Sequence, residues 1–255
     1  MEDYIKKYDV VNFNFQDLTA FVDKHWTLQL AQEILSRNLN ISWQLPSGIR
    51  IEYFDNEVVL AVYKSGCRNM AFAPESASPK ILESVKKDID LGQMEKAIKV
   101  AVSSNINLSC FFVIGFPLET VETLRMSLNF IRKLARLGVS DIGLAQFVPY
   151  PGSELFDQLL QSGEIKLDDE FFLSPMEFYL KTSHSYAKNF TPQQLFKWQI
   201  RILVNFYLFS FFFYPFRTFK NVVKALFFKK EETRYAKFIT DVVYRRPGMF
   251  LKSRN

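Results

Sequence analysis

Several strand-like runs of this sequence are followed at once by polar or glycine residues whose chemistry suits ligand binding. Glu75 and Ser76 follow the run 69–73, and both side chains carry hydrogen-bonding groups. Gly115 ends the apolar run 108–114, and because it lacks a side chain a flat ligand can approach the backbone there. An ordinary strand-to-helix turn, with the carboxylate favoured at a helix amino terminus, explains the same residues. Both alternatives stay open when the residues are taken one by one.

Other reactive residue types form no catalytic or metal-binding pattern. Cys67 and Cys110 cannot build a disulfide framework, and their spacing matches no zinc motif. His25 and His184 have no partner at ligand spacing, which favours structural or solvent-exposed roles. Arg50, at another strand end, either binds a carboxylate or phosphate or has a surface role. No GxGxxG or GxxxxGK sequence is present, which excludes the usual dinucleotide and nucleoside-triphosphate loops.

The elements that must position these residues alternate between strands and helices. Apolar, β-branched or alternating runs predict five strands, at 10–15, 41–45, 69–73, 108–114 and 141–148. Helical spacing, caps and prolines predict helices at 19–39, from Asp55 to Gly66, from Pro79, at 91–103 and from Thr120 to Gly138. A repeated βα unit indicates a parallel sheet with right-handed crossovers, in which the carboxyl ends of the strands share one edge.

Length, composition and charge indicate a globular protein with two unlike parts. The chain has 255 residues, 48% of them hydrophobic and 23% charged, which is enough to bury a large core. Residues 196–255 contain 13 Lys and Arg and 3 Asp and Glu, a net charge of +10. Because the whole chain has a net charge of +5, residues 1–195 carry a net charge of −5. Because the strand and helix pattern also changes after about Ser162, we expect a body at 1–162 and a carboxyl-terminal extension at 163–255. No signal-peptide pattern begins the chain, and we expect a reducing, cytoplasmic setting.

Three segments at strand ends carry a family resemblance. They are GCRNMAFAPES at Gly66–Ser76, FFVIGFPLET at Phe111–Thr120 and FVPYPGSEL at Phe147–Leu155. In order and spacing they resemble the radical S-adenosylmethionine (SAM) superfamily, and most closely the group with an upstream cobalamin-binding domain. The resemblance runs from about Tyr4 to Leu159. It implies an α/β fold, a partial (β/α) TIM-like barrel of about five parallel strands, to which this sequence adds a helical, aromatic-rich extension.

The resemblance implies SAM and a [4Fe-4S] cluster as cofactors, with cobalamin as a further candidate in the parent protein. In the family, three thiolates of a CxxxCxxC motif after the first barrel strand hold the cluster, and one iron stays open to SAM. That strand and motif are not found here, and Cys67 and Cys110 lie in the wrong places to replace them. We therefore expect the cluster ligands in a missing amino-terminal domain or a partner chain. A fragment, a mis-assigned start, a split gene product and a decayed relative are the alternatives.

Individual residues are assigned to SAM by their place in the family motifs. Gln16 and Asp17 match the position near the SAM amino group, where amide and carboxylate acceptors suit an ammonium. Glu75 and Ser76 match the position near its ribose or amino-acid part. The residues that match the adenine contacts are Ile114, Gly115, Phe116, Phe147, Val148 and Pro149. We place Tyr150 and Arg50 on the substrate side, although Tyr150 could equally be a packed aromatic at the barrel rim. Glu119 is expected to cap the helix that follows.

The aromatic-rich segment Phe196–Phe216 has two explanations. Thr191 and Pro192 predict the start of a helix, and the apolar run 202–216, which Pro215 should end, is shorter than the roughly 20 residues of a membrane span. In the first explanation the aromatics pack on the barrel or on a partner domain. In the second, an aromatic face with nearby basic residues makes peripheral contact with an anionic membrane through residues 196–230. No nucleic-acid partner is expected, because the basic residues are interleaved with bulky apolar ones.

The function expected from these features is that of the carboxyl-terminal portion of a radical SAM enzyme. It would bind SAM beside a cluster held outside this chain, for radical methylation, ring formation or rearrangement of an unidentified small-molecule or lipid-like substrate. By itself the chain is expected to be inactive, because it lacks the cluster cysteines. The alternative is a non-catalytic remnant or a membrane-peripheral binding protein that keeps the partial barrel as a scaffold.

Overall fold

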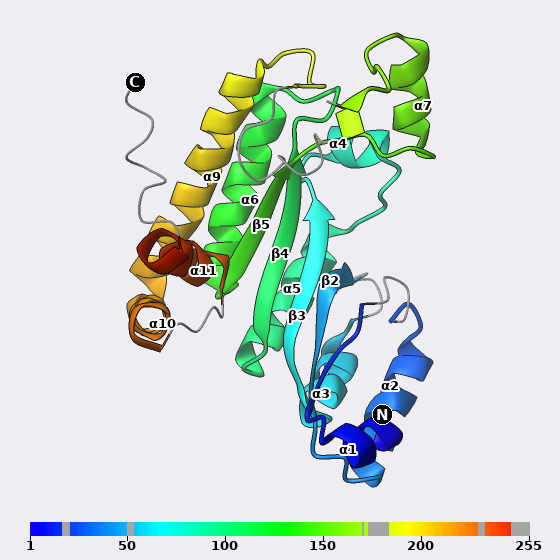
Figure 1. Ribbon diagram of the computed structural model, residues 1–255, viewed down its shortest axis with the longest axis vertical. Helices are drawn as coiled ribbons and strands as arrows, with labels where there is room; N and C mark the ends of the chain where they lie inside the picture. Colours follow the sequence, from blue (N-terminus) through cyan, green and yellow to red (C-terminus); the bar gives the residue numbers. More distant parts are fainter. Residues whose placement is uncertain (17–20, 50–53, 170, 173–183, 229–232, 246–255) are drawn as a thin grey trace.

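A parallel β-sheet forms the centre of the molecule in the computed structural model, which describes residues 1–16, 21–49, 54–169, 171–172, 184–228 and 233–245. Its five strands lie side by side in chain order, and every neighbouring pair is parallel. The strands are β1 Asn12–Asn14, β2 Ser42–Ile49, β3 Cys67–Glu75, β4 Asn107–Ile114 and β5 Asp141–Gln146. The predicted α/β fold with five parallel strands is confirmed, and all the strands point toward one edge of the sheet (Figure 1).

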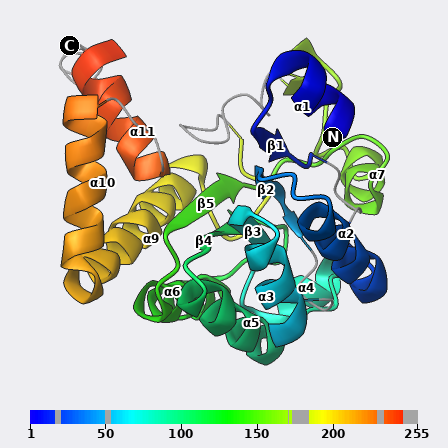
Figure 2. The same cartoon turned by 90° about the horizontal axis from the view of Figure 1, so that it is seen from below.

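Helices that connect the strands lie in an arc along one face of the sheet (Figure 2). Side chains of β4 alternate accordingly: Leu108, Cys110, Phe112 and Ile114 are buried in the core with these helices, whereas the residues between them are only partly buried. The helices up to residue 161 are α1 Glu2–Tyr8, α2 Lys24–Ser36, α3 Asn56–Lys64, α4 Pro79–Ser84, α5 Leu91–Ser103, α6 Val121–Leu137 and α7 Glu154–Gln161.

The carboxyl-terminal helices pack at the β5 side of the sheet. They are α9 Pro192–Phe213, α10 Pro215–Phe228, α11 Arg234–Thr240 and a π-helical turn at Asp241–Arg245. Helix α9 packs along α6 and β5, and its Ile202 and Phe206 are buried in the core of the sheet. Helix α10 then turns away by 113°. Of the helices that the structure describes, none alone has the length and apolarity to cross a membrane; α9 and α10 meet that limit only together, as this bent pair.

Strand β2 continues through residues that were expected to end it. The sequence predicts an end at Pro46, but the strand runs to Ile49. Its pairing with β3 shifts before Ile49, so that residues 46–48 bulge out of the ladder. Gly48 has φ of +80°, and a Cβ atom there would lie 3.0 Å from that of Ala73. The turn-forming residues therefore make an irregularity inside a longer strand.

The start of α2 differs from the prediction, and Pro215 has a second role that was not predicted. Helix α2 begins at Lys24 and not at residue 19, because the Asp23 side chain caps it by accepting a hydrogen bond of 2.6 Å from the amide of Trp26. Pro215 follows the end of α9, as predicted, but it also begins α10. Proline suits the first position of a helix, because the amide that it lacks has no intrahelical partner there.

Candidate functional site

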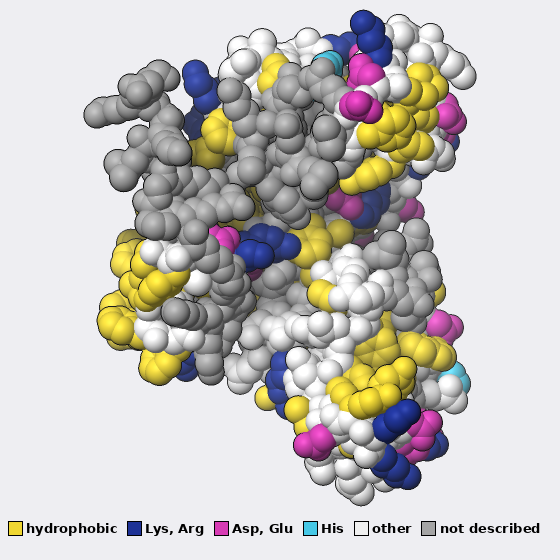
Figure 3. All heavy atoms as spheres, in the orientation of Figure 1, with side chains coloured by type: hydrophobic (Ala, Val, Ile, Leu, Met, Phe, Trp, Pro, Cys, Tyr) yellow, Lys and Arg dark blue, Asp and Glu magenta, His cyan; other side chains and the backbone are white. Residues whose placement is uncertain are grey.

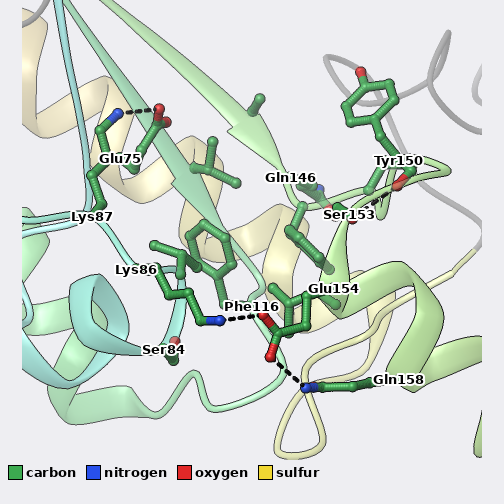
Figure 4. Close-up of a pocket in the computed structure, with 16 residues that line it drawn as sticks. Glu75, Ser84, Lys86, Lys87, Phe116, Gln146, Tyr150, Ser153, Glu154 and Gln158 are labelled. Carbon is green, nitrogen blue, oxygen red and sulfur yellow. Dashed lines mark hydrogen bonds and ion pairs between the residues drawn. The ribbon is translucent and has the colours of Figure 1, made fainter.

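The carboxyl ends of β3, β4 and β5 open into one cavity of about 630 Å³, flanked by the end of α4 and by α7 (Figure 4). This volume lies within the range of roughly 300–1,000 Å³ that is common for small-molecule sites. The cavity is lined by Glu75, Ser84, Val85, Lys86, Lys87, Val113, Phe116, Ala145, Gln146, Phe147, Val148, Tyr150, Ser153, Glu154, Leu155 and Gln158.

Five of the predicted site residues meet at this cavity, although they come from separate parts of the chain. They are Glu75, Phe116, Phe147, Val148 and Tyr150. The rings of Phe116 and Phe147 lie with their centroids 5.0 Å apart. The amide of Phe147 also donates a hydrogen bond of 2.8 Å to the carbonyl of Ile114. The ends of β4 and β5 are thus tied together as one wall of the cavity.

The polar side of the cavity carries paired charges. Glu75 forms an ion pair of 2.7 Å with Nζ of Lys87, and Lys86 pairs with Glu154 of α7 (Figure 4). Gln158 donates a hydrogen bond of 3.3 Å to the Glu154 carboxylate. Glu75 has φ of +62°, a conformation that costs a non-glycine residue about 1–3 kcal/mol and that gathers at ligand sites. The cavity therefore offers acceptors and donors without a net charge.

Several other predicted residues are placed elsewhere. Ser76 is buried, and its Oγ lies 3.3 Å from that of Ser127 on α6. Ile114 faces the helices, so its neighbour Val113 faces the cavity in its place. Pro149 is buried and is not among the lining residues. Gln16 is exposed beyond the end of β1 and accepts a hydrogen bond of 3.0 Å from Ser47. Asp17 and Arg50 lie outside the described residues.

Gly115 is required by the turn that follows β4. Its φ is +90°, and a Cβ atom there would lie 2.9 Å from Cδ1 of Leu195, so α9 packs against this side of the residue. Its amide donates a hydrogen bond of 3.2 Å to Glu119, whose carboxylate also accepts one from the hydroxyl of Thr123. Burial raises the pKa of the Glu119 carboxyl. The prediction that Glu119 caps the helix is wrong, because Thr120 is the N-cap and Glu119 braces the turn.

The chain's two cysteines do not fit an iron–sulfur cluster. Cys67 and Cys110 are buried in the core on β3 and β4. Burial raises the pKa of Cys67 to about 12 and also raises that of Cys110, whereas metal ligation needs an accessible thiolate. Within the described residues, no group of three or more His, Cys, Asp or Glu could hold a metal ion.

Sequence reasoning missed most of the polar side of the cavity. Lys86 and Lys87 come from the loop after α4, which matches no motif and shows no periodicity. Val113 and Ala145 could have been predicted from the alternation of side chains along a strand, because the residues on either side of each one face the helices. Ser153 lies in the motif after β5, where its side chain caps α7 by accepting a hydrogen bond from the amide of Phe156.

Comparison with curated proteins finds methyltransferases and cyclases. The chain is 30% identical over 205 residues to an uncharacterized methyltransferase of Pyrococcus horikoshii, a match that covers 79% of this chain and 42% of that protein. It is 25% identical over 166 residues to the anaerobic magnesium-protoporphyrin IX monomethyl ester cyclase of Rubrivivax gelatinosus, covering 65% of this chain and 29% of the cyclase. The chain thus spans less than half the length of these relatives. No protein-family model matches it.

Comparison with solved structures finds the same fold. TsrM, a radical SAM methyltransferase from Kitasatospora setae determined with cobalamin and a [4Fe-4S] cluster bound, aligns with a TM-score of 0.55 at 15% identity. The alignment covers 63% of this chain and 30% of TsrM. The TsrM structure with tryptophan substrate and a SAM analogue bound gives a TM-score of 0.54. At this level of identity the likeness concerns the fold, and it agrees with the partial barrel seen here.

Proposed function

We propose that this chain, a member of the radical SAM superfamily, holds part of a SAM molecule in the cavity at the ends of β3, β4 and β5. One observation carries the proposal. Glu75, Phe116 and Phe147 stand in three separate sequence motifs that predict contacts with SAM, and they line a single cavity. The parallel sheet brings the ends of its strands to one edge, and these three residues line the same cavity at that edge.

The cavity suits the adenosyl group of SAM in both shape and polarity. Val113, Phe116, Ala145 and Val148 supply apolar surface for the flat adenine ring. The Glu75 carboxylate and the Lys87 ammonium group supply an acceptor and a donor for the ribose hydroxyls. This chain's residues would bind and orient SAM and keep water from it, which is the usual share of the protein in cofactor chemistry.

We place the cluster outside this chain, because its two cysteines are buried in the core. SAM bound beside such a cluster would supply the radical chemistry of methylation, ring formation or rearrangement. The side chains that line the cavity would bind and orient SAM and would not react themselves. Cobalamin is a further candidate for the whole protein, since TsrM was determined with cobalamin bound. The substrate would be a small or lipid-like molecule that reaches SAM from outside this cavity.

The proposal is tested by ligand binding, which needs no cluster and no turnover. Saturation-transfer NMR on the full chain would use S-adenosylhomocysteine as the probe and compare its adenine protons with those of the amino-acid part. We expect the adenine protons to receive the stronger saturation, because the cavity holds the adenosyl part. Ala145→Phe, which fills the cavity from β5, should abolish the signal.

A matched variant separates loss of the site from loss of the fold. Val121→Phe adds the same ring at a position that is 42% exposed at the start of α6 and away from the cavity lining, so it should bind like the wild type. Circular dichroism and the melting temperature of all three proteins should agree. Absence of saturation transfer in the wild type, or equal transfer in both variants, would overturn the proposal.

A further inference from the structure

Helix α10 turns its most apolar side away from the protein. The outer face of α10, defined here as Phe216, Phe219, Val223 and Phe227, follows the spacing of one helix side. Phe216, Phe219 and Phe227 are 88%, 66% and 76% exposed. Figure 3 shows hydrophobic side chains gathered over the carboxyl-terminal helices, on the left of the view. A helix that only completes a globular core would bury this face instead.

The contacts that hold α10 explain why its apolar side faces outward. Arg217 donates hydrogen bonds of 2.5 Å to the carbonyl of Gly138 and 3.1 Å to that of Val139. It also donates a hydrogen bond of 2.9 Å to the hydroxyl of Ser210, and its guanidinium lies 4.5 Å from the ring centroid of Tyr214. On the same side the small side chain of Ala225 is fully buried. Polar and small residues thus hold the helix against the rest of the protein, and the phenylalanines of the outer face remain exposed.

The charge pattern indicates what this partner is. Residues 192–228 contain no Asp or Glu, and their basic residues are Lys197, Arg201, Arg217, Lys220 and Lys224. Lys220 is exposed and lies one turn after Phe216, beside the outer face. The cores of protein interfaces are depleted of lysine, whereas lysine beside exposed phenylalanine is the pattern of helices that lie on anionic lipid surfaces.

We propose that α10 docks on an anionic membrane surface, with Phe216, Phe219 and Phe227 inserted at the level of the headgroups and Lys220 paired with lipid phosphates. The helix lies along the surface, because the 113° bend after α9 prevents the pair from crossing the bilayer as one rod. Helix α10 lies near the amino-terminal ends of the strands, because Arg217 binds the carbonyls of Gly138 and Val139, which directly precede β5. In Figure 1 helix α10 lies away from α4 and α7, which flank the cavity, so docking through α10 leaves the cavity open and does not depend on SAM binding.

Flotation of the full chain with lipid vesicles tests this surface directly. Vesicles of phosphatidylcholine alone would be compared with vesicles that contain about 30% phosphatidylglycerol. We expect the chain to float with the anionic vesicles and to be released at about 0.5 M salt, where charge attraction is screened. The triple variant F216S/F219S/F227S should lower the bound fraction at least tenfold, and Lys220→Glu should weaken binding to anionic vesicles alone.

The control removes an exposed aromatic side chain from another part of the chain. Phe172 is 58% exposed and far along the chain from α10, so Phe172→Ser should leave flotation unchanged. Circular dichroism should be the same for every variant, because each removed ring is exposed. A wild-type chain that stays with the unbound protein, or a triple variant that still floats, would overturn the proposal. Self-association without lipid binding, seen by light scattering, would identify the face as a protein interface and would also overturn it.

Discussion

The backbone amide of Gly115 donates a hydrogen bond of 3.2 Å to the buried carboxylate of Glu119, four residues further along the chain. The second oxygen of that carboxylate accepts the hydroxyl of Thr123, so one side chain closes the turn between β4 and α6 from inside. Phe116, which lines the cavity, lies within this turn, directly after Gly115. The shape of the candidate site therefore depends on a residue that does not line it.

Replacing Glu119 by alanine should destabilise the fold. The change removes the acceptor of the Gly115 amide in a buried place, which costs about 1–3 kcal/mol, whereas the hydroxyl of Thr123 keeps the carbonyl of Thr120 at 3.0 Å. Urea denaturation followed by circular dichroism measures the loss. Glu83→Ala, at an exposed position of α4, should change the free energy of unfolding by about 0.5 kcal/mol or less. Similar values for the two variants would contradict the role given to Glu119.

The same residue predicts a pH dependence. Burial raises the pKa of Glu119 in the folded chain above its ordinary value of 4.5, so the folded state holds this proton more tightly than the unfolded state. The stability that Glu119 contributes is then complete below pH 4.5 and is lost as the pH rises through the folded pKa. Relative to Glu119→Gln, which does not titrate, the wild type should lose stability as the pH increases. If the difference in free energy of unfolding between the wild type and Glu119→Gln stays constant as the pH rises, or changes in favour of the wild type, the prediction is wrong.

Gly115→Ala should also be costly, and part of the cost should come from Leu195. A left-handed backbone strains alanine by about 1–2 kcal/mol, and its Cβ atom would lie 2.9 Å from Cδ1 of Leu195. Leu195→Ala removes this contact but opens a space in the core, with a loss of about 2–5 kcal/mol of its own. In a double-mutant cycle we expect the combined variant to lose at least about 0.5 kcal/mol less than the sum of the two single changes. Strict additivity would show that α9 does not press on this turn.

Asp141 ties the carboxyl-terminal helices to β5. Its buried carboxylate accepts hydrogen bonds from the hydroxyl of Tyr207 at 2.7 Å and the amide of Arg234 at 2.9 Å, and it forms an ion pair of 3.3 Å with the Arg234 guanidinium. Burial raises the pKa of Asp141, which Arg234 partly opposes. Arg234→Met should therefore cost about 1–3 kcal/mol, since the arginine itself is 41% exposed.

The sign of the pH effect checks this interpretation. Without Arg234 the pKa of Asp141 rises further, so the variant should lose more stability at pH values above the folded pKa than below it. Thermal unfolding at acidic and at neutral pH measures the difference. Lys237→Met, on the exposed side of α11, should show no such trend.

The buried cysteines predict how the chain reacts with thiol reagents. Cys67 and Cys110 are in the core, and burial raises the pKa of Cys67 to about 12, so neither is a thiolate at neutral pH. Ellman's reagent should label neither thiol in the native chain and both in urea. Rapid labelling of the native chain would show that the core around β3 and β4 opens, and would reopen the question of metal ligation by these residues.

Much of the fold was accessible from the sequence, for identifiable reasons. Runs such as 108–114 are short, apolar and bounded by Gly115 and Pro117, so the position of β4 could be predicted within one residue. The end of β2 could not, because Pro46 and Gly48 are turn residues in most settings and only the pairing with β3 keeps the strand going. The cavity lining could be predicted in part, since motif residues such as Phe116 and Phe147 lie at strand ends.

What the sequence alone determined is the order of the strands, the edge at which they end and the family to which their turns belong, because local spacing and turn chemistry encode these features. Only the tertiary structure decided where the side chains point. It turned Ser76 into the core, set Leu195 against Gly115, brought Lys87 to Glu75 and left Phe216 in the solvent. Each of these depends on contacts between distant segments, whose packing the local pattern of residues does not encode.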